Sequence, residues 1–255
     1  MVYIIRNEEK NDMILNFYKS ENEIKDLDTW KLFAPPMGAD KQWKDGRSAK
    51  ELARYITNSL PNLPKELREA ISPVVREEVF YWSAEYVTDF AKYDCGIGNG
   101  RNHDMAMWNG EIFIGIEAKA DESLGNNNLG YEYQQGSGNK KHRIEKLTQI
   151  VFGTNDIKKF SNIQYQLLTA TSAILLEARE RKLKKAMLIV IVFKKDGVDD
   201  RGKPYYSSQK ISNNEKAISQ FLETIGYTQK SMNQLQTHGV YADIELFYKK
   251  IEITV

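Results

Sequence analysis

Residues 101–119 read Arg-Asn-His-Asp-Met-Ala-Met-Trp-Asn-Gly-Glu-Ile-Phe-Ile-Gly-Ile-Glu-Ala-Lys, and this stretch decides the fold. Two runs that can lie extended, 101–108 and 111–119, flank Asn109-Gly110. Asn-Gly is the dipeptide most typical of a two-residue turn between antiparallel strands. The sequence therefore predicts a β-hairpin here.

Polar side chains gather on one face of this predicted hairpin. Gly115, Glu117 and Lys119 share a face of the second strand, because side chains alternate with a period of two. A two-residue turn places Asp104 opposite Gly115, on the same face. Glu117 is then the diagonal neighbour of Asp104, at about 7 Å by the usual cross-strand spacing. Gly115 has no side chain to fill the space between them.

Helices are expected on either side of the hairpin. Ser48 and Glu51 fit a capping box that opens a short helix ending near Asn58. Ser72-Pro73 is typical of a helix start, and a stripe at spacings of three and four predicts a helix over 73–91. The apolar residues of that stripe are Val75, Val79, Trp82, Tyr86 and Phe90.

The second half of the chain predicts a loop, a helix and two strands. Gly and Asn residues over 123–141 favour a loop, and 160–182 carries the periodicity of a long buried helix. The apolar run 186–193 is typical of a strand covered on both faces. Alternating residues in the tail, 240–255, favour a further strand. This order predicts an α/β fold with a mixed central sheet flanked by helices.

Composition and charge restrict the class of protein. The chain has 255 residues with 41% hydrophobic and 28% charged side chains, which excludes wholesale disorder. A net charge of +1 means that any anion binding depends on a local patch. The single cysteine, Cys95, excludes a disulfide framework and a cysteine zinc cage. No apolar run approaches the length of a membrane span, so a cytoplasmic protein without membrane contact is expected.

Two carboxylates and an amine on one face of an apolar hairpin suggest metal chemistry. At about 4 Å, Asp104 and Glu117 would repel by roughly 4 kcal/mol at an effective dielectric of 20. A hard cation such as Mg²⁺ removes that repulsion and activates water toward phosphate esters. Lys119 adds a positive charge near the reacting groups. The alternative is an ion pair between Lys119 and Glu117 on a solvated sheet face.

The pattern Asp104…Glu117-Ala118-Lys119 resembles the signature of the PD-(D/E)xK nuclease superfamily, which has a restriction-endonuclease-like core. The order of predicted elements between about 73 and 193 is similar to that core, with one strand unplaced. His103 stands where the superfamily often has proline. Three segments resemble an uncharacterised bacterial subgroup: Trp43-Lys44-Asp45-Gly46-Arg47-Ser48-Ala49, Glu117-Ala118-Lys119-Ala120-Asp121-Glu122 and Tyr165-Gln166-Leu167-Leu168-Thr169-Ala170-Thr171.

The resemblance implies roles for individual residues. Asp104 and Glu117 would hold Mg²⁺ or Mn²⁺, together with the backbone carbonyl of Ala118, and Lys119 would act on the water or the phosphate. Such families often add an acid from the first helix, for which Glu78 is preferred over Glu85. They also often carry a glutamine on the second helix, and Gln166 falls on the expected buried face. A structural hydrogen bond is the alternative role of Gln166, and a solvated helix position is that of Glu78.

The resemblance also implies an organisation and a function. Residues 1–63 would form a helical extension packed on a core at 64–195, with a C-terminal extension at 196–255. The expected function is metal-dependent hydrolysis of phosphodiester bonds, with DNA as the partner and a role in restriction or another defence. A homodimer is compatible with this class. The alternative is a nuclease fold that has lost catalysis and acts as a binding module or scaffold.

Overall fold

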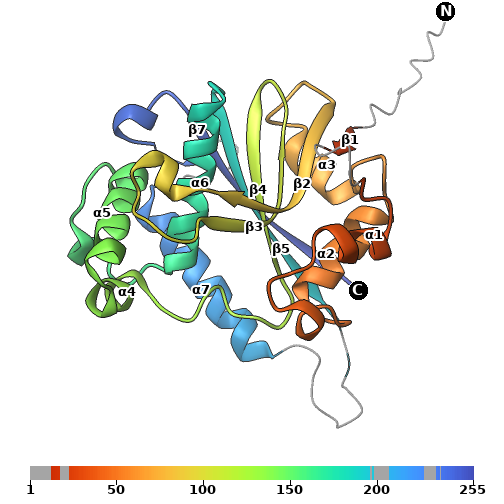
Figure 1. The fold of residues 1–255 in the computed structure, drawn as a ribbon, viewed down its shortest axis with the longest axis horizontal. Helices are drawn as coiled ribbons and strands as arrows, with labels where there is room; N and C mark the ends of the chain where they lie inside the picture. Colours follow the sequence, from red (N-terminus) through yellow and green to blue (C-terminus); the bar gives the residue numbers. More distant parts are fainter. Residues whose placement is uncertain (1–12, 18–22, 196, 198–206, 227–233, 236) are drawn as a thin grey trace, which may run out of the picture.

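The computed structural model describes residues 13–17, 23–195, 197, 207–226, 234–235 and 237–255. Within these residues a mixed β-sheet lies between two layers of helices (Figure 1), in the strand order β1-β2-β3-β4-β5-β7-β6. The strands are β1 (Ile14–Phe17), β2 (Val79–Thr88), β3 (Arg101–Trp108), β4 (Ile112–Lys119), β5 (Lys185–Lys194), β6 (Gln234–Leu235) and β7 (Glu245–Thr254). The α-helices are α1 (Leu27–Phe33), α2 (Ser48–Thr57), α3 (Lys65–Ile71), α4 (Leu129–Gln135), α5 (Gly138–Phe152), α6 (Tyr165–Glu180) and α7 (Ser208–Thr224).

The sheet contains both antiparallel and parallel pairs of strands. β2, β3 and β4 form an antiparallel meander. β5 lies parallel to β4, and β7 lies parallel to β5. At the two edges, β1 is parallel to β2 and β6 is antiparallel to β7. The predicted α/β class with a mixed central sheet is confirmed, as are the strands predicted at 101–108, 111–119 and 186–193.

Each face of the sheet buries its own apolar core. Leu168 and Ile174 of α6 pack on one face with residues of α5 and α7. Leu52 of α2 and Leu67 of α3 pack on the other face with Trp30 of α1. β4 is buried along its whole length because it is covered on both sides. The two extensions predicted at 1–63 and 196–255 both contribute strands to this sheet, through β1 and through β6 and β7.

The helix predicted over 73–91 is wrong, because most of this segment is strand β2. Phe80 and Trp82 are buried, whereas Val79 and Tyr81 are 44% and 50% exposed, so burial alternates with the period of a strand. Residues four positions apart share a face in a strand as well as in a helix, which made the stripe ambiguous. Aromatic and β-branched content, high here, favours the strand. Ser72 caps the C-terminus of α3 instead of starting a helix.

The loop predicted over 123–141 is also partly wrong. α4 occupies Leu129–Gln135, and α5 begins at Gly138. Asn128 is the N-cap of α4, where its side chain accepts the backbone N–H of Tyr131 at 2.9 Å. The asparagines that suggested a loop therefore act in part as a helix cap. The helix predicted over 160–182 is confirmed as α6, which begins at Tyr165.

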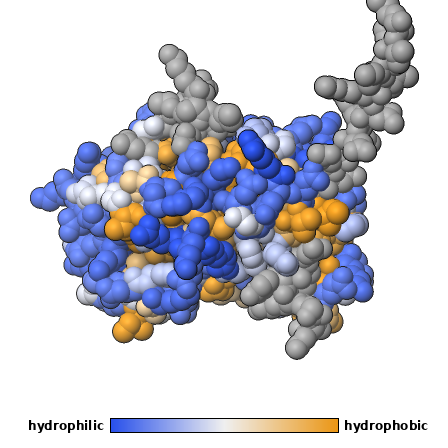
Figure 2. Space-filling view, turned by 90° about the horizontal axis from the view of Figure 1, so that it is seen from above, coloured by the Kyte–Doolittle hydropathy of each residue, from blue (hydrophilic) through white to orange (hydrophobic). Residues whose placement is uncertain are grey.

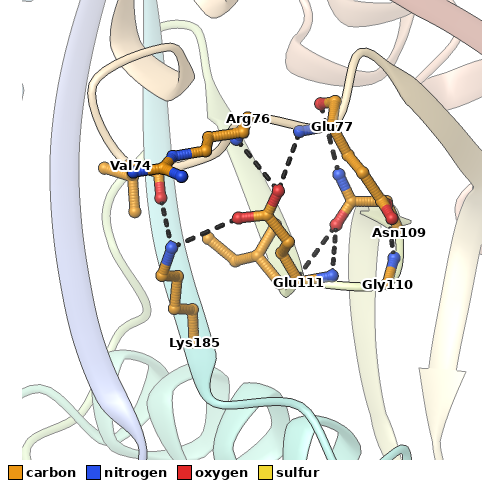
Figure 3. A network of polar contacts seen from close by, with 8 residues as sticks. Val74, Arg76, Glu77, Asn109, Gly110, Glu111 and Lys185 are labelled. Carbon is orange, nitrogen blue, oxygen red and sulfur yellow. Dashed lines mark hydrogen bonds and ion pairs between the residues drawn. The ribbon is translucent and has the colours of Figure 1, made fainter.

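A polar network fixes the turn between β3 and β4 to the segment before β2 (Figure 3). Glu111 accepts the backbone N–H groups of Arg76 and Glu77 at 3.0 and 2.8 Å, and Lys185 of β5 lies 3.3 Å from its other oxygen. Glu77 accepts the N–H of Gly110 at 2.7 Å. These contacts hold the end of the hairpin that is remote from Asp104.

The visible surface is mixed in polarity. Hydrophilic residues cover most of the face in Figure 2, and hydrophobic residues lie between them in separate patches. In the part of the chain that the structure describes, no helix combines the length and the apolar character needed to cross a membrane.

Candidate active site

The register of β3 and β4 differs from the predicted one by two residues. Trp108 lies opposite Phe113 and Ala106 opposite Gly115, so four residues, 109–112, separate the first paired residues instead of two. Asn109 closes this loop with its side-chain oxygen, which accepts the N–H groups of Glu111 and Ile112 at 2.9 and 3.0 Å. An asparagine that bonds to backbone two residues ahead stabilises this longer loop. When the register is extended by two positions beyond the pair Ala106 and Gly115, Asp104 lies opposite Glu117.

Next to this position the regular alternation of side chains breaks in both β2 and β3, so that residues two apart point to opposite faces of the sheet. Ala84 packs in the core of α1–α3, whereas Tyr86 packs against the opposite core, although residues two apart normally share a face. Glu85 lies between them with a φ of 48°. On β3, Met105 faces the α1–α3 core and His103 contacts the opposite face. The reversal leaves Glu85 and Asp104 side by side at the distorted part of the two strands.

Asp104 is fixed to the neighbouring strand through its side chain. Its Oδ2 accepts the backbone N–H of Ala118 at 2.7 Å. Burial, together with the nearby charge of Glu117, raises the pKa of Asp104 to about 6. This carboxylate is therefore held in place while its negative charge is poorly compensated.

Glu117 is 1% exposed and is surrounded by donors. Its Oε1 forms an ion pair with Nη2 of Arg101 and lies 3.2 Å from Nδ1 of His103. Its Oε2 accepts a hydrogen bond from Nε2 of Gln166 at 3.2 Å. Burial acts to raise the pKa of Glu117, but Arg101 and His103 outweigh it and bring that pKa to about 2. Glu117 is thus a carboxylate that stays ionised in a buried position.

Lys119 is 7% exposed on the same strand. Among the described residues, no ion pair within 4 Å joins its amine to a carboxylate, and Arg101 is the cation in contact with Glu117. The side chain lines a small cavity with Val190 and Ile218. The alternative in which Lys119 serves as the ion-pair partner of Glu117 is therefore not what the geometry shows.

Of the two further predicted site residues, Gln166 lies in the site and Glu78 lies outside it. Gln166 faces the sheet as expected, and its hydrogen bond to Glu117 brings the second helix into the site. Glu78 does not belong to the site. Its backbone oxygen accepts the N–H of Ile14 at 2.7 Å near the start of β2, seven residues before Glu85 along the chain. Because a strand rises about 3.3 Å per residue, the two acids are about 20 Å apart.

Glu85 is the acid that the fold brings to this position. Burial raises the pKa of Glu85 to about 7, and the charges of Asp104 and Glu117 act in the same direction. Asn102 donates a short hydrogen bond to its carboxylate. The preference for Glu78 came from the predicted helix over 73–91. Because most of this segment is strand β2, Glu85 replaces Glu78 as the candidate acid.

Sequence reasoning missed Arg101 and His103 as partners of Glu117. His103 is fully buried, and burial lowers the pKa of its imidazole. Its ring lies where a side chain on Gly115 would project, since a Cβ there would be 2.8 Å from His103 Cε1. The missing side chain of Gly115 therefore makes room for His103. The signal in the sequence was a strand whose first four positions, 101–104, are all polar.

A polar cleft of about 220 Å³ opens beside Glu117. Arg101 and Gln166 line it and also contact Glu117. Arg143 lines it too, but its guanidinium donates to the backbone oxygens of Cys95, Ile97 and Asn99 at 2.9–3.3 Å. Of these cleft residues, Arg101 is the cation in contact with the candidate site.

The segments that resembled the bacterial subgroup meet at the C-terminal end of β4. Ser48 at the start of α2 donates to Glu122 at 3.0 Å, and Gly46 donates its N–H to Glu51 at 2.7 Å. Ser48 and Glu51 thus make tertiary and loop contacts instead of the expected capping box. Gln166 brings the third segment to Glu117.

In the described parts of the chain, no group of three or more His, Cys, Asp and Glu side chains is arranged to hold a metal ion. Fold and site together define an α/β protein with a buried carboxylate centre on adjacent strands. A family model described as a domain of unknown function, DUF6946, matches residues 23–254, and the chain belongs to this family. No curated protein matches the chain in these comparisons. No solved structure matches it either.

Proposed function

We propose that the protein is a metal-dependent nuclease that hydrolyses phosphodiester bonds in DNA, with a role in restriction or another defence. The observation that carries the proposal is the hydrogen bond from Ala118 N–H to Asp104, next to the buried Glu117. It joins the acidic residue of β3 to the Glu-x-Lys segment of β4. The element order α3, β2, β3, β4, followed after the two inserted helices α4 and α5 by α6 and β5, supports a PD-(D/E)xK-like core.

The donor set at this position fits Mg²⁺ or Mn²⁺. Asp104 and Glu117 supply carboxylate oxygens. The pKa values of Asp104 and Glu85 are raised first by burial and then by the neighbouring carboxylates, and a cation would offset both effects. Because the N–H and the carbonyl of one residue in a strand point to the same side, the carbonyl of Ala118 would be available to a cation on the side of Asp104. Glu117 would have to exchange its contact with Arg101. A bound divalent ion supplies positive charge to the scissile phosphate and lowers the pKa of a bound water.

The surrounding residues prepare Glu117 and Lys119 for this role. His103 and Gln166 each bond to a different oxygen of Glu117, so they fix the plane of its carboxylate. Lys119 follows two residues later on the same face, with its charge free of an ion pair among the described residues. A buried ammonium without a fixed partner can stabilise negative charge that develops on a phosphate.

DNA binding depends on local cations, because the net charge is +1. Lys44 and Arg47 are exposed in the segment before α2, and the contact between Ser48 and Glu122 brings this segment beside the end of β4. We assign these two cations to the phosphate backbone that flanks the reacting bond. The proposal holds for a monomer and for a homodimer.

A second candidate function is a catalytically inactive nuclease fold that binds a partner. The ion pair between Arg101 and Glu117 favours it, because the guanidinium already neutralises the carboxylate that would bind a metal. The two candidates differ in what divalent cations do. An inactive module needs none, whereas the nuclease binds them at Asp104 and Glu117.

The proposal is tested by incubating the purified protein with plasmid, linear and single-stranded DNA and with RNA, in Mg²⁺, Mn²⁺ or excess chelator. We expect cleavage of DNA with either cation, none with chelator, and none by Glu117→Gln. Lys65→Gln, a substitution on the exposed surface of α3, serves as the matched control and is expected to keep full activity. Absence of cleavage on every substrate, without heat release on metal titration, would leave the binding module as the better account.

A further inference from the structure

Arg101 belongs both to the candidate site around Glu117 and to the polar cleft beside it. Its guanidinium forms the ion pair with Glu117, and its side chain also lines the polar cleft. The side chain is 15% exposed, so it is accessible from the cleft. Its Nε is buried and has no hydrogen-bond partner within the described residues. The guanidinium therefore has donor capacity that Glu117 does not use.

Glu117 needs a cation in any state in which it is ionised. At 1% exposure, a carboxylate without a counter-charge would be strongly destabilised. Arg101 supplies that charge in this structure. A divalent cation bound to the same carboxylate would repel the guanidinium at close range, so the two cations are alternatives.

We propose that Arg101 is an exchangeable counter-ion: it neutralises Glu117 in the metal-free protein and binds a DNA phosphate in the adjoining cleft once a divalent cation takes Glu117. The inference rests on the proposed function. The planar fork of a guanidinium suits two phosphate oxygens, and Arg101 lines the cleft with its side chain partly exposed. His103 and Gln166 keep their hydrogen bonds to Glu117 in both states. The exchange couples metal binding to DNA binding.

The test uses Arg101→Gln in the full-length protein, because glutamine keeps a hydrogen-bond donor and removes the charge. Mn²⁺ affinity is measured by calorimetry without DNA, and the affinity for an oligonucleotide is measured by fluorescence anisotropy with Ca²⁺. The exchange predicts that Mn²⁺ binds about tenfold more tightly and DNA about tenfold more weakly, within the usual range of coupling between sites. A gain in Mn²⁺ affinity together with a loss of DNA affinity is not expected if Arg101 only stabilises the fold.

Lys119→Met is the matched control, because it removes a nearby positive charge that does not contact Glu117. It should raise Mn²⁺ affinity much less than Arg101→Gln does. Equal gains in the two variants, or an unchanged Mn²⁺ affinity in Arg101→Gln, overturn the exchange while leaving the proposed nuclease intact. Absence of Mn²⁺ binding to the wild type and to Arg101→Gln overturns both.

Arg101→Lys provides a second variant if the glutamine protein does not fold. Lysine keeps the charge but presents a point charge in place of the planar fork. DNA affinity in Ca²⁺ should then fall, with a smaller gain in Mn²⁺ affinity than expected for glutamine. A lysine variant that binds DNA as tightly as the wild type contradicts a phosphate contact by Arg101.

Discussion

Asp104 crosses from β3 to β4 and accepts the backbone N–H of Ala118 at 2.7 Å. The contact lies just beyond the last backbone pair of β3 and β4, Met105 with Ile116, so a side chain continues the link between the two strands. It brings a charged oxygen beside the strand that carries Glu117 and Lys119. The chemistry proposed for this protein depends on that link between two strands.

The acids on β2 and β3 predict an unusual dependence of stability on pH. The pKa values of Asp104 and Glu85 are raised to about 6 and about 7, so the folded protein holds these protons more tightly than the unfolded chain. Their contribution to stability is present below about pH 4, where both states are protonated, and is lost as the pH rises through 6 and 7.

Asp104→Asn should therefore stabilise the protein at pH 8 by about 1–3 kcal/mol and have little effect at pH 4, as measured by urea unfolding. Asparagine keeps an oxygen that can accept the Ala118 N–H. Addition of Mg²⁺ should raise the melting temperature of the wild type at pH 8 but not that of the variant. A variant less stable than the wild type at pH 8 would show that the Asp104 charge is well compensated.

Gly115 is predicted to tolerate no side chain. A Cβ at this position would lie 2.6 Å from Ile174 Cγ2 and 2.8 Å from the His103 ring. Both neighbours are fully buried, so Gly115→Ala should cost about 1–3 kcal/mol of unfolding free energy and displace His103 from Glu117. Gly138→Ala is the matched control, because nothing lies within 4 Å of its added Cβ. Equal stability of the two variants would contradict the packing of His103 against Gly115.

Glu111 is predicted to stabilise the fold without acting in the site. Burial acts to raise its pKa, but the N–H groups of Glu77 and Arg76 and the charge of Lys185 bring that pKa below its ordinary value. The lowered pKa contributes stability above about pH 4.5 that is lost as the pH falls through the folded-state value.

Glu111→Ala should destabilise the protein by about 1–3 kcal/mol at pH 7, because two backbone N–H groups lose their acceptor. Calorimetry should find the same Mn²⁺ affinity as in the wild type. A large loss of metal affinity would mean that the two ends of the hairpin are coupled.

Local signals in the sequence predicted the strands and helices whose periodicity was unambiguous. The run 186–193 and the helix at 160–182 are long and apolar, and the structure confirms both as β5 and α6. The segment 73–91 was misassigned because Trp82, Tyr86 and Phe90 satisfy the period of a helix and that of a strand. Aromatic and β-branched residues were the distinguishing feature there.

The site was predictable only in part, for physical reasons. Asp104, Glu117 and Lys119 were found because alternation along a strand is a local property. The partners of Glu117 depend on the face reversal in β3, which moves His103 to the other side of the sheet and follows no simple period. The register of the hairpin depended on Asn109, whose side chain closes the turn between Trp108 and Phe113.

Lys119 tests the central claim most directly. Its amine has no ion pair among the described residues, so Lys119→Met should abolish the nicking of supercoiled plasmid in Mn²⁺ while changing stability by less than about 1 kcal/mol. The measurement compares plasmid conversion by wild type and variant, with Mn²⁺ affinity and melting temperature determined on the same samples. We predict cleavage by the wild type, none by the variant, and metal binding by both. A variant that nicks plasmid at the wild-type rate would contradict the account.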